Sequence, residues 1–363
     1  MQVFNKISKT IKIWLQAAWY KTTLLSFLLQ LVLWPLSLVY RFLAFSHKAL
    51  FKLGLLKKHK VSVPVVVVGN IVVGGGGKTP TVIALVQHLQ AQNIQVGVIS
   101  RGYGRNCSAC LEVTKSSAIS DVGDEPAGIF IACGVPVFVA NKRFDAASAL
   151  LKAYPATQVI ISDDGLQHHA LHHDIAITVF DDRGMGNGML LPAGPLRESK
   201  VKVQNSLVLH TGNQTIQLQH TIAPQFTASR ALTQFALTSS GSEVALSALN
   251  ALAVSSNKPL MALAGIANPE AFFEMLRDVG LNLAETVALP DHFDFHYDLN
   301  STLGNKYAGY SDKYTVLCTV KDAVKLWKLN PNAIAVPLDF APEAAFFTAF
   351  DSMLKPKFPH LKT

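Results

Sequence analysis

The sequence has little charge and few cysteines for its length. Only 15% of its 363 residues are Asp, Glu, Lys or Arg, while 50% are hydrophobic, and this composition excludes a disordered or collagen-like chain. The four cysteines are too few for a disulfide scaffold, and the single C-x-x-C, Cys107 with Cys110, has no second pair at zinc-site spacing. At roughly 150 residues per domain, the length predicts two domains with additions.

Acidic residues are missing from the first third of the chain. No Asp or Glu precedes Glu112, whereas residues 1–111 carry 13 Lys and Arg, and the remainder holds 19 basic residues together with all 24 acidic ones. The excess of positive charge lies in the N-terminal third, and the rest of the chain is mildly acidic. This argues against a nucleic-acid-binding protein, whose positive charge should belong to the folded domain. We therefore expect no nucleic-acid partner, and a membrane surface suits the basic segment better.

The N-terminal segment has a long apolar run. Residues 22–40 carry no charge, and as a helix these 19 residues would reach roughly 28 Å, near the thickness of the hydrocarbon core of a bilayer. Basic residues flank both ends and Pro35 invites a kink, so a spanning helix and a helix lying in the membrane surface both stay open. We expect residues 1–60 to form a membrane-associated helical segment.

A buried-strand pattern leads into a glycine-rich loop. Residues 63–69, VPVVVVG, are apolar and mostly β-branched, and the loop after them ends in four glycines, Lys78 and Thr79 before a helical pattern. This order predicts a phosphate site, because glycine N–H groups can face phosphate oxygens, Lys78 can neutralise them and Thr79 can ligate Mg²⁺. The strict motif has glycine where this chain has Val72, so a glycine-rich turn with an accidental Lys-Thr stays as an alternative.

Two further strand patterns end in pairs of aspartates. Residues 158–162 lead into the pair at 163–164, and residues 175–180 lead into the pair at 181–182. A carboxylate at the end of a strand beside the loop strand is where a P-loop protein holds Mg²⁺. The first pair is favoured because DDGLQH brings further polar groups, and the second can be a solvated strand end.

The alternation of strand and helix patterns predicts the architecture. It indicates a P-loop NTPase-like α/β fold with a mainly parallel, doubly wound sheet over residues 61–212, whose ligand lies beyond the carboxyl ends of the strands. Residues 213–258 are polar, with alternating rather than helical stretches, and predict a connecting ribbon and loops. Strand patterns then recur, and predict a second, smaller α/β domain over residues 259–363.

Nine segments together resemble the tetraacyldisaccharide 4′-kinases of lipid A (lipopolysaccharide) biosynthesis, which phosphorylate a membrane glycolipid with ATP. They run in order over about 260 residues: VPVVVVGNIVVGGGGKTP (63–80), VGVISRGYGR (96–105), VGDEP (122–126), GVPVFVANKR (134–143), VIISDDGLQHHAL (159–171), GNGMLLPAGPLRE (186–198), ALAGIANPEAFF (262–273), LPDHFDF (289–295) and KDAVKL (321–326). The resemblance implies transfer of the γ-phosphoryl group of ATP to the 4′-hydroxyl of tetraacyldisaccharide 1-phosphate. It also implies a place at the inner membrane, with the catalytic domains on its cytoplasmic face and a cleft that closes between them.

The resemblance also assigns roles to residues at matching positions. It implies that Asp124 is the base towards the 4′-hydroxyl, that His292 is its partner, and that Arg197 stabilises charge on the transferred group. The implied ATP-binding segment consists of Val72, Val73, Gly74, Gly75, Gly76, Gly77, Lys78 and Thr79. The implied Mg²⁺ ligands are Thr79, Asp163 and Asp164. The residues implied to hold the anionic head group are Tyr103, Glu125, Arg143, Gln167 and His168.

Other interpretations stay open beside this one. Without the resemblance, Asp124-Glu125-Pro126 would be read as a helix start. The alternative function is a membrane-associated nucleotide switch or partitioning ATPase that acts through protein partners, but its loop would carry a signature lysine at position 73, where this chain has Val73. The chain also departs from the family's usual residues at Gly76 and Val320. We expect ATP, Mg²⁺, the glycolipid and membrane lipids as ligands, and no obligate protein partner.

Overall fold

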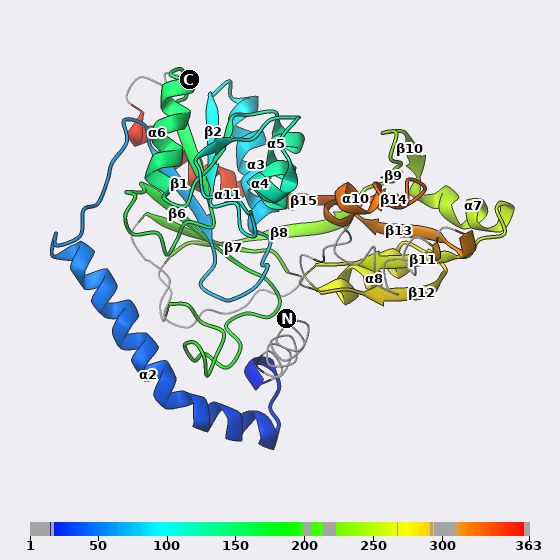
Figure 1. The fold of residues 1–363 in the computed structure, drawn as a ribbon, viewed down its shortest axis with the longest axis horizontal. Helices are drawn as coiled ribbons and strands as arrows, with labels where there is room; N and C mark the ends of the chain where they lie inside the picture. The colour runs from blue at the N-terminus through cyan, green and yellow to red at the C-terminus, as the bar shows by residue number, and fades with distance from the viewer. Residues whose placement is uncertain are drawn as a thin grey trace. The chain divides into compact units, whose positions relative to one another are not determined.

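The chain divides into two compact units, each built around its own sheet (Figure 1). The first unit consists of Met1–Ser229 with Ala341–Thr363, and the second of Arg230–Phe340. The computed structural model describes residues 15, 18–198, 205–212, 223–266, 268–290, 293, 309–310 and 312–358.

The described residues of the first unit contain a nine-stranded sheet in the order β15-β8-β7-β6-β1-β5-β2-β4-β3. Its strands are β1 (Val65–Gly69), β2 (Val96–Ser100), β3 (Leu111–Glu112), β4 (Val137–Val139), β5 (Val159–Asp163), β6 (Ile175–Phe180), β7 (Ser206–His210), β8 (Gln225–Leu232) and β15 (Leu338–Pro342). From β4 to β8 every neighbouring pair is parallel, and β3 is antiparallel to β4. The prediction of a mainly parallel sheet is confirmed.

The central strands are buried on both faces, which explains their continuous apolar sequences. The helices of this unit are α2 (Leu24–Lys52), α3 (Lys78–Ala91), α4 (Ile119–Val122), α5 (Asp124–Cys133), α6 (Arg143–Ala153) and α11 (Ala344–Leu354). In Figure 1, α6 lies on one side of the sheet, and α3 and α5 lie on the other. The packing is tight, since an added Cβ at Gly97 of β2 would lie 2.6 Å from Leu150 of α6.

The strand order places a topological switch between β1 and β5. From β1 the chain passes through α3 to β2 on one side of the sheet, whereas from β5 it passes to β6 on the other side. Connections that leave two neighbouring parallel strands in opposite directions open a crevice at their carboxyl ends, where α/β proteins bind ligands. The glycine-rich loop follows β1 and the first aspartate pair ends β5, so both lie at this crevice.

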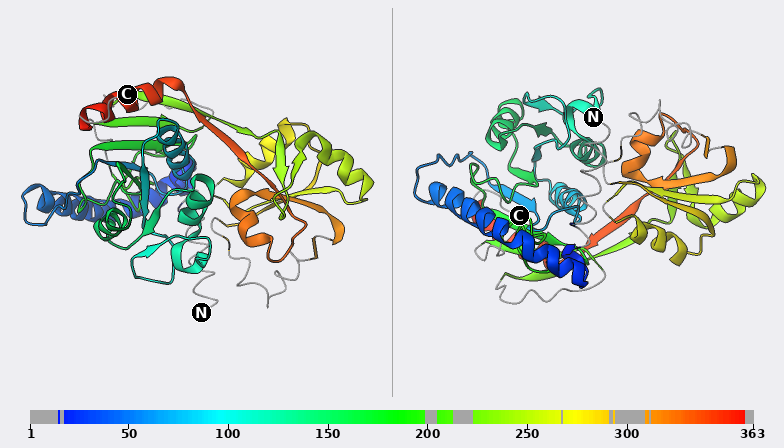
Figure 2. Two further views of the ribbon diagram at one scale, coloured as in Figure 1. Left: turned by 90° about the horizontal axis from the view of Figure 1, so that it is seen from above. Right: turned by 60° about the horizontal axis from the view of Figure 1, so that its bottom comes forward.

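The long helix α2 buries polar side chains and exposes apolar ones. It runs for 29 residues with Pro35 inside it, and Figure 2 shows it as a rod along the first unit. By length and composition it could cross a membrane. Its two buried residues are Ser26 and Ser37, while Phe42 is 68% exposed and Leu31 is 60% exposed. A helix that packs on the core of a soluble protein does the reverse, because it buries its apolar side chains and exposes its polar ones.

The second unit contains, among its described residues, a six-stranded sheet in the order β10-β9-β14-β13-β11-β12. Its elements are β9 (Phe235–Leu237), β10 (Glu243–Ala245), η1 (Leu246–Ala248), α7 (Leu249–Ser255), β11 (Leu260–Ala264), α8 (Pro269–Asp278), β12 (Leu283–Ala288), β13 (Thr315–Thr319), α10 (Val320–Leu326) and β14 (Ile334–Val336). The core on one face includes Phe273 of α8, and the core on the other includes Leu326 of α10. A last 3₁₀ turn, η2 (Lys355–Lys357), belongs to the first unit.

The units differ from the expected domain boundaries in two places. The expected connecting segment contributes β8 to the first sheet, and β9, β10, η1 and α7 to the second unit, so part of it is helical. The last residues return to the first unit, because Phe346 and Phe350 of α11 are fully buried and Phe346 stacks edge-on against Phe226 of β8. His88 of α3 adds a contact of 3.0 Å to Asp351.

Candidate active site

The glycine-rich loop joins β1 to α3 at the switch point. Gly74 has φ +111° and Gly77 has φ +86°, which are conformations that favour glycine. Lys78 is the first residue of α3 and is only 9% exposed, and its Nζ lies 3.7 Å from Oδ1 of Asp164. Thr79 follows in the first turn of the helix. The strand–loop–helix order that the phosphate-site prediction requires is therefore present.

Val72 and Val73, which precede the glycine run, pair with the segment at residues 195–196. Val72 is buried and forms an antiparallel bridge with Leu196, and the Val73 N–H donates to the Pro195 carbonyl at 2.9 Å. An N–H that is donated to a carbonyl is not available to a phosphate oxygen. Within this loop the Val73 N–H is therefore taken, and Val72, where the strict motif has glycine, is a paired residue rather than a turn residue.

The first aspartate pair lies at the end of β5, next to the loop. Asp163 is fully buried, and its Oδ2 accepts from the Ser100 hydroxyl at 3.3 Å. Burial, with Glu125 and Asp164 nearby, raises the pKa of Asp163 to about 7, against the opposing effect of Lys78 and Arg143. The Oδ1 atoms of both aspartates are buried and have no hydrogen-bond partner among the described residues.

These oxygen atoms suit a magnesium ion. Mg²⁺ prefers hard oxygen ligands and usually takes only one or two carboxylates beside phosphate and water. The two Oδ1 atoms, which accept no hydrogen bond among the described residues, fit that requirement, and Thr79 in the first turn of α3 offers a hydroxyl oxygen. Within the described residues no cluster of three or more His, Cys, Asp or Glu side chains could hold a metal by itself.

Arg143 supports the aspartate pair from the protein interior. It is 4% exposed, and its Nη2 donates to the carbonyls of Asp163 at 3.3 Å and Asp164 at 3.1 Å. Burial lowers the pKa of Arg143 to about 10, although the two aspartates oppose this shift. Asp164 itself has φ +47°, a left-handed conformation that these contacts help to hold.

Arg197 contacts both Asp164 and Gln167 from a separate segment of the chain. The Arg197 Nη1 lies 3.5 Å from Asp164 Oδ1 and 3.5 Å from Gln167 Oε1. The Arg197 N–H donates to the Ile71 carbonyl at 2.7 Å, which fixes this arginine beside the loop strand. Gln167 in turn donates to Glu198 at 3.0 Å, an acidic residue that the sequence analysis did not single out.

His168 lies next to this cluster in a neutral state. Burial lowers the pKa of His168 to about 4, and Arg143 and Arg101 lower it further. Its Nε2 is buried without a hydrogen-bond partner in the described part of the chain. A neutral imidazole at this place can accept or donate one hydrogen bond to a ligand.

Asp124 and Tyr103 are brought together by two glycines. Asp124 begins α5 after Gly123, and an added Cβ at Gly123 would lie 3.1 Å from Gly102 and 3.3 Å from the Tyr103 carbonyl. The helix start therefore packs on the loop after β2, and the Tyr103 side chain is 72% exposed there. Glu125, next to Asp124, lies close enough to Asp163 for its charge to raise the pKa of that residue. His292 lies outside the described residues.

The second aspartate pair has a different environment. Asp181 receives two hydrogen bonds from Arg183 Nε, at 3.1 and 2.9 Å, and a third from its Nη2 at 2.6 Å. Arg183 also donates to the Gly75 carbonyl of the loop. Sequence reasoning missed Arg183; the only signal was its place just after the aspartate pair that follows β6.

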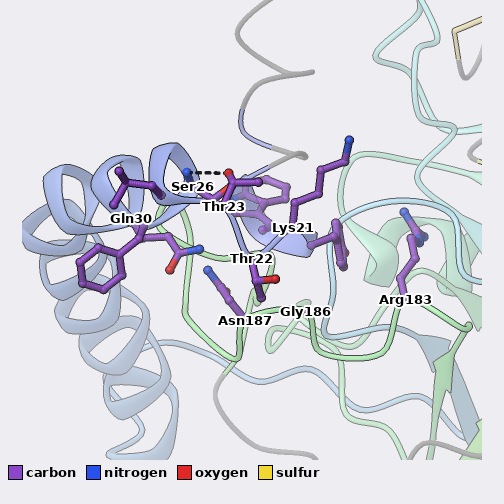
Figure 3. A pocket seen from close by; sticks show the side chains of 12 residues that line it. Lys21, Thr22, Thr23, Ser26, Gln30, Arg183, Gly186 and Asn187 are labelled. Atoms are coloured by element: carbon purple, nitrogen blue, oxygen red, sulfur yellow. Dashed lines mark hydrogen bonds between the residues drawn. The ribbon is translucent and has the colours of Figure 1, made fainter.

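A pocket lies beside Arg183 at the start of α2. It is lined by residues from 19 to 30 and by Arg183, Gly186 and Asn187, and Figure 3 shows Arg183 at its edge. The segment that follows Arg183 contacts α2 repeatedly. The Ser37 hydroxyl donates to the Leu190 carbonyl at 2.9 Å and accepts from the Ala193 N–H at 3.0 Å, and Tyr40 donates to the Arg197 carbonyl at 3.1 Å.

Comparisons with known proteins point to a single family. A family model described as LpxK, tetraacyldisaccharide-1-P 4'-kinase, matches residues 29–355. The tetraacyldisaccharide 4'-kinase of Polaromonas naphthalenivorans is 50% identical over 333 residues, covering 90% of this chain and 91% of that protein, and that of Shewanella halifaxensis is 38% identical, covering 95% and 94%. A crystal structure of LpxK from Aquifex aeolicus, described as in complex with ATP, aligns with a TM-score of 0.71 and 27% identity over 91% of this chain and 99% of that one.

Proposed function

The chain belongs to the tetraacyldisaccharide-1-P 4'-kinase family, and on this premise we propose which of its residues perform the reaction. It is an ATP-dependent kinase of lipid A biosynthesis, which transfers the γ-phosphoryl group of ATP to the 4′-hydroxyl of tetraacyldisaccharide 1-phosphate. The observation that carries the residue assignment is the meeting of Lys78, the carboxylates of Asp163 and Asp164, and Arg197 at the switch point of the first sheet.

The phosphate end of ATP is held by the glycine run and Lys78. The backbone N–H groups of the glycines and the start of α3 offer donors to the phosphate oxygens. Thr79, Asp163 and Asp164 would hold Mg²⁺, which would neutralise charge on the phosphate oxygens. The contact of Lys78 with Asp164 keeps the ammonium group at the mouth of the loop before the nucleotide binds.

Arg197 stabilises the negative charge of the phosphoryl group in transfer. Its guanidinium lies beside Asp164, and its backbone is fixed to the loop strand through Ile71. A cation held in place before the reaction stabilises developing charge without reorganising at that moment. Tyr103, Glu125, Gln167 and His168 are assigned to the head group of the lipid, as the family resemblance implies. Arg143, which the resemblance also assigns to the head group, is buried and donates to the carbonyls of Asp163 and Asp164, so we assign it to holding the aspartate pair in place.

Asp124 is the base that accepts the proton of the 4′-hydroxyl. It stands at the start of α5, beside the exposed loop of Tyr103, where an acceptor lipid can reach it. Its partner is assigned to His292 by family resemblance alone. A positioned general base contributes roughly 10²–10⁴-fold to a rate, so Asp124→Asn should lower kcat by about that factor and leave the Kd for ATP nearly unchanged.

The test is a transfer assay in detergent with labelled ATP, Mg²⁺ and tetraacyldisaccharide 1-phosphate. Asp121→Asn is the matched control, because Asp121 is an exposed aspartate three positions away and should keep full activity. Hydrolysis of ATP by the wild type without label on the lipid would contradict the function. An equal loss of ATP affinity in Asp124→Asn would contradict only the assignment of the base.

We also infer that α2 attaches the enzyme to the inner membrane with the first unit on the cytoplasmic side. The buried Ser26 and Ser37 face the protein, and the apolar side chains left exposed suit the acyl region of a lipid layer. Basic residues near both ends of α2 suit anionic headgroups. ATP is the phosphoryl donor, which favours the cytoplasmic face.

A further inference from the structure

Three of the four carbonyl groups of the glycine run, Gly74–Gly77, are held by side chains that lie outside the run. Three side chains each donate to one of them: Asn70 to Gly74 at 2.8 Å, Arg183 to Gly75, and Thr211 to Gly76 at 2.9 Å. Two of the donors, Arg183 and Thr211, are 108 and 135 residues away from their acceptors along the chain. Three successive carbonyls held by separate side chains form an arrangement that the phosphate-binding motif does not contain.

The direction of a carbonyl fixes the direction of the next N–H. In a trans peptide the two groups lie in one plane and point to opposite sides. Holding the carbonyls of Gly74, Gly75 and Gly76 therefore turns the N–H groups of the residues after them to the other side of the loop. Those N–H groups are the donors that a phosphate-binding loop presents to its ligand.

We propose that Asn70, Arg183 and Thr211 are positioning residues that set the phosphate loop in its binding conformation before ATP arrives. Four glycines in a row have the greatest backbone freedom of any residues and no side chains with which to hold themselves. The fixing contacts must therefore come from residues outside the glycine run. Asn70 is 2% exposed and Thr211 is fully buried, so both donors are shielded from competing water.

Arg183 acts through its geometry rather than through its charge. Its guanidinium is paired with Asp181 by three hydrogen bonds, so its charge is already compensated. Nη2, which donates to Asp181, also donates to the Gly75 carbonyl, so the pairing with Asp181 keeps this nitrogen directed at the loop. The guanidinium also lies directly against the loop, since an added Cβ at Gly74 would be 2.9 Å from Arg183 Nη1.

The proposal deepens the proposed function, since it rests on this loop binding the phosphates of ATP. Thr211→Val keeps the shape of the side chain and removes the hydroxyl donor. Arg183→Lys keeps the positive charge and removes the planar guanidinium with its several N–H donors. A loop that must be ordered at the moment of binding loses affinity, so the KM for ATP should rise about tenfold in each variant. The KM for the lipid should stay within about twofold, and saturating ATP should restore most of kcat.

Control variants separate positioning from folding. Thr178→Val removes the hydroxyl of an equally buried threonine in β6 and should leave the KM for ATP unchanged, and Thr211→Ser keeps the donor and should behave as the wild type. A merely structural role would lower Tm and the active fraction, hence kcat, without moving the KM for ATP.

Two results would overturn the proposal. One is an unchanged KM for ATP in both Thr211→Val and Arg183→Lys, when the wild type is active. The other is an unchanged KM in Arg183→Lys alone, which would assign Arg183 to charge neutralisation instead. A wild type that does not use ATP would contradict the proposed function itself, so the two failures are distinguishable in one assay.

Discussion

Ser37→Ala should loosen the contact between the apolar helix α2 and the segment that carries Arg197. Ser37 is 6% exposed, and its hydroxyl both donates to the Leu190 carbonyl and accepts from the Ala193 N–H. Alanine removes both bonds. Leaving a buried donor or acceptor without its partner costs about 1–3 kcal/mol.

The Leu190 carbonyl keeps the Gly194 N–H as a donor, so the Ala193 N–H is the group that loses its partner. The higher helix propensity of alanine stabilises α2 whether or not the segment is docked, so it does not offset this loss. The docking of the segment on α2 should therefore weaken by about 1–3 kcal/mol. With about 1.4 kcal/mol for each factor of ten, local opening at Ala193 should become roughly 5- to 150-fold more frequent. Arg197 follows Ala193 in the same segment, so kcat in detergent should fall while the KM for ATP moves less.

Amide hydrogen exchange at Ala193, measured beside the transfer assay, checks this prediction. Leu36→Ala is the matched control, because Leu36 precedes Ser37 on the same helix and is 56% exposed. It should change neither the exchange at Ala193 nor kcat in detergent. Unchanged exchange and unchanged kcat in Ser37→Ala would refute the reasoning that α2 supports the catalytic segment.

Two further predictions concern the phosphate site and its neighbour. Lys78→Ala removes the ammonium group beside Asp164. A hydrogen bond to a charged group contributes about 1.5–3 kcal/mol, so kcat/KM for ATP should fall by roughly 10- to 150-fold. Unchanged steady-state kinetics would count against a role of Lys78 in phosphate binding. Because the pKa of His168 is lowered to about 4, the unfolded chain binds one more proton than the folded chain between about pH 6.5 and pH 4, so folding stability falls as the pH falls through this window. Relative to the wild type, His168→Gln should therefore gain in Tm as the pH is lowered from 6.5 to 4, and a constant difference in Tm would contradict the buried, neutral histidine.

The amino-acid sequence by itself determined the local elements and the contiguous part of the site. Runs of β-branched residues predicted β1 and β6 because a strand buried on both faces has no polar side to alternate with. The glycine run with Lys78 predicted a phosphate site because all the residues of this motif are neighbours in the chain. Asp163 and Asp164 were readable because parallel strands align their carboxyl ends, so a polar pair after an apolar run indicates a site.

Only the tertiary structure decided which distant residues complete the site. Arg183 and Thr211 reach the loop through the pairing of β1 with β6 and β6 with β7, and no local pattern gives the order of strands. Ser37 lies in an apolar run that gives no sign of its role, and only the tertiary structure brings its hydroxyl to the 190–193 segment. The return of α11 to the first sheet was hidden for the same reason. Contacts between residues a hundred positions apart depend on strand order and register, which the whole chain settles together.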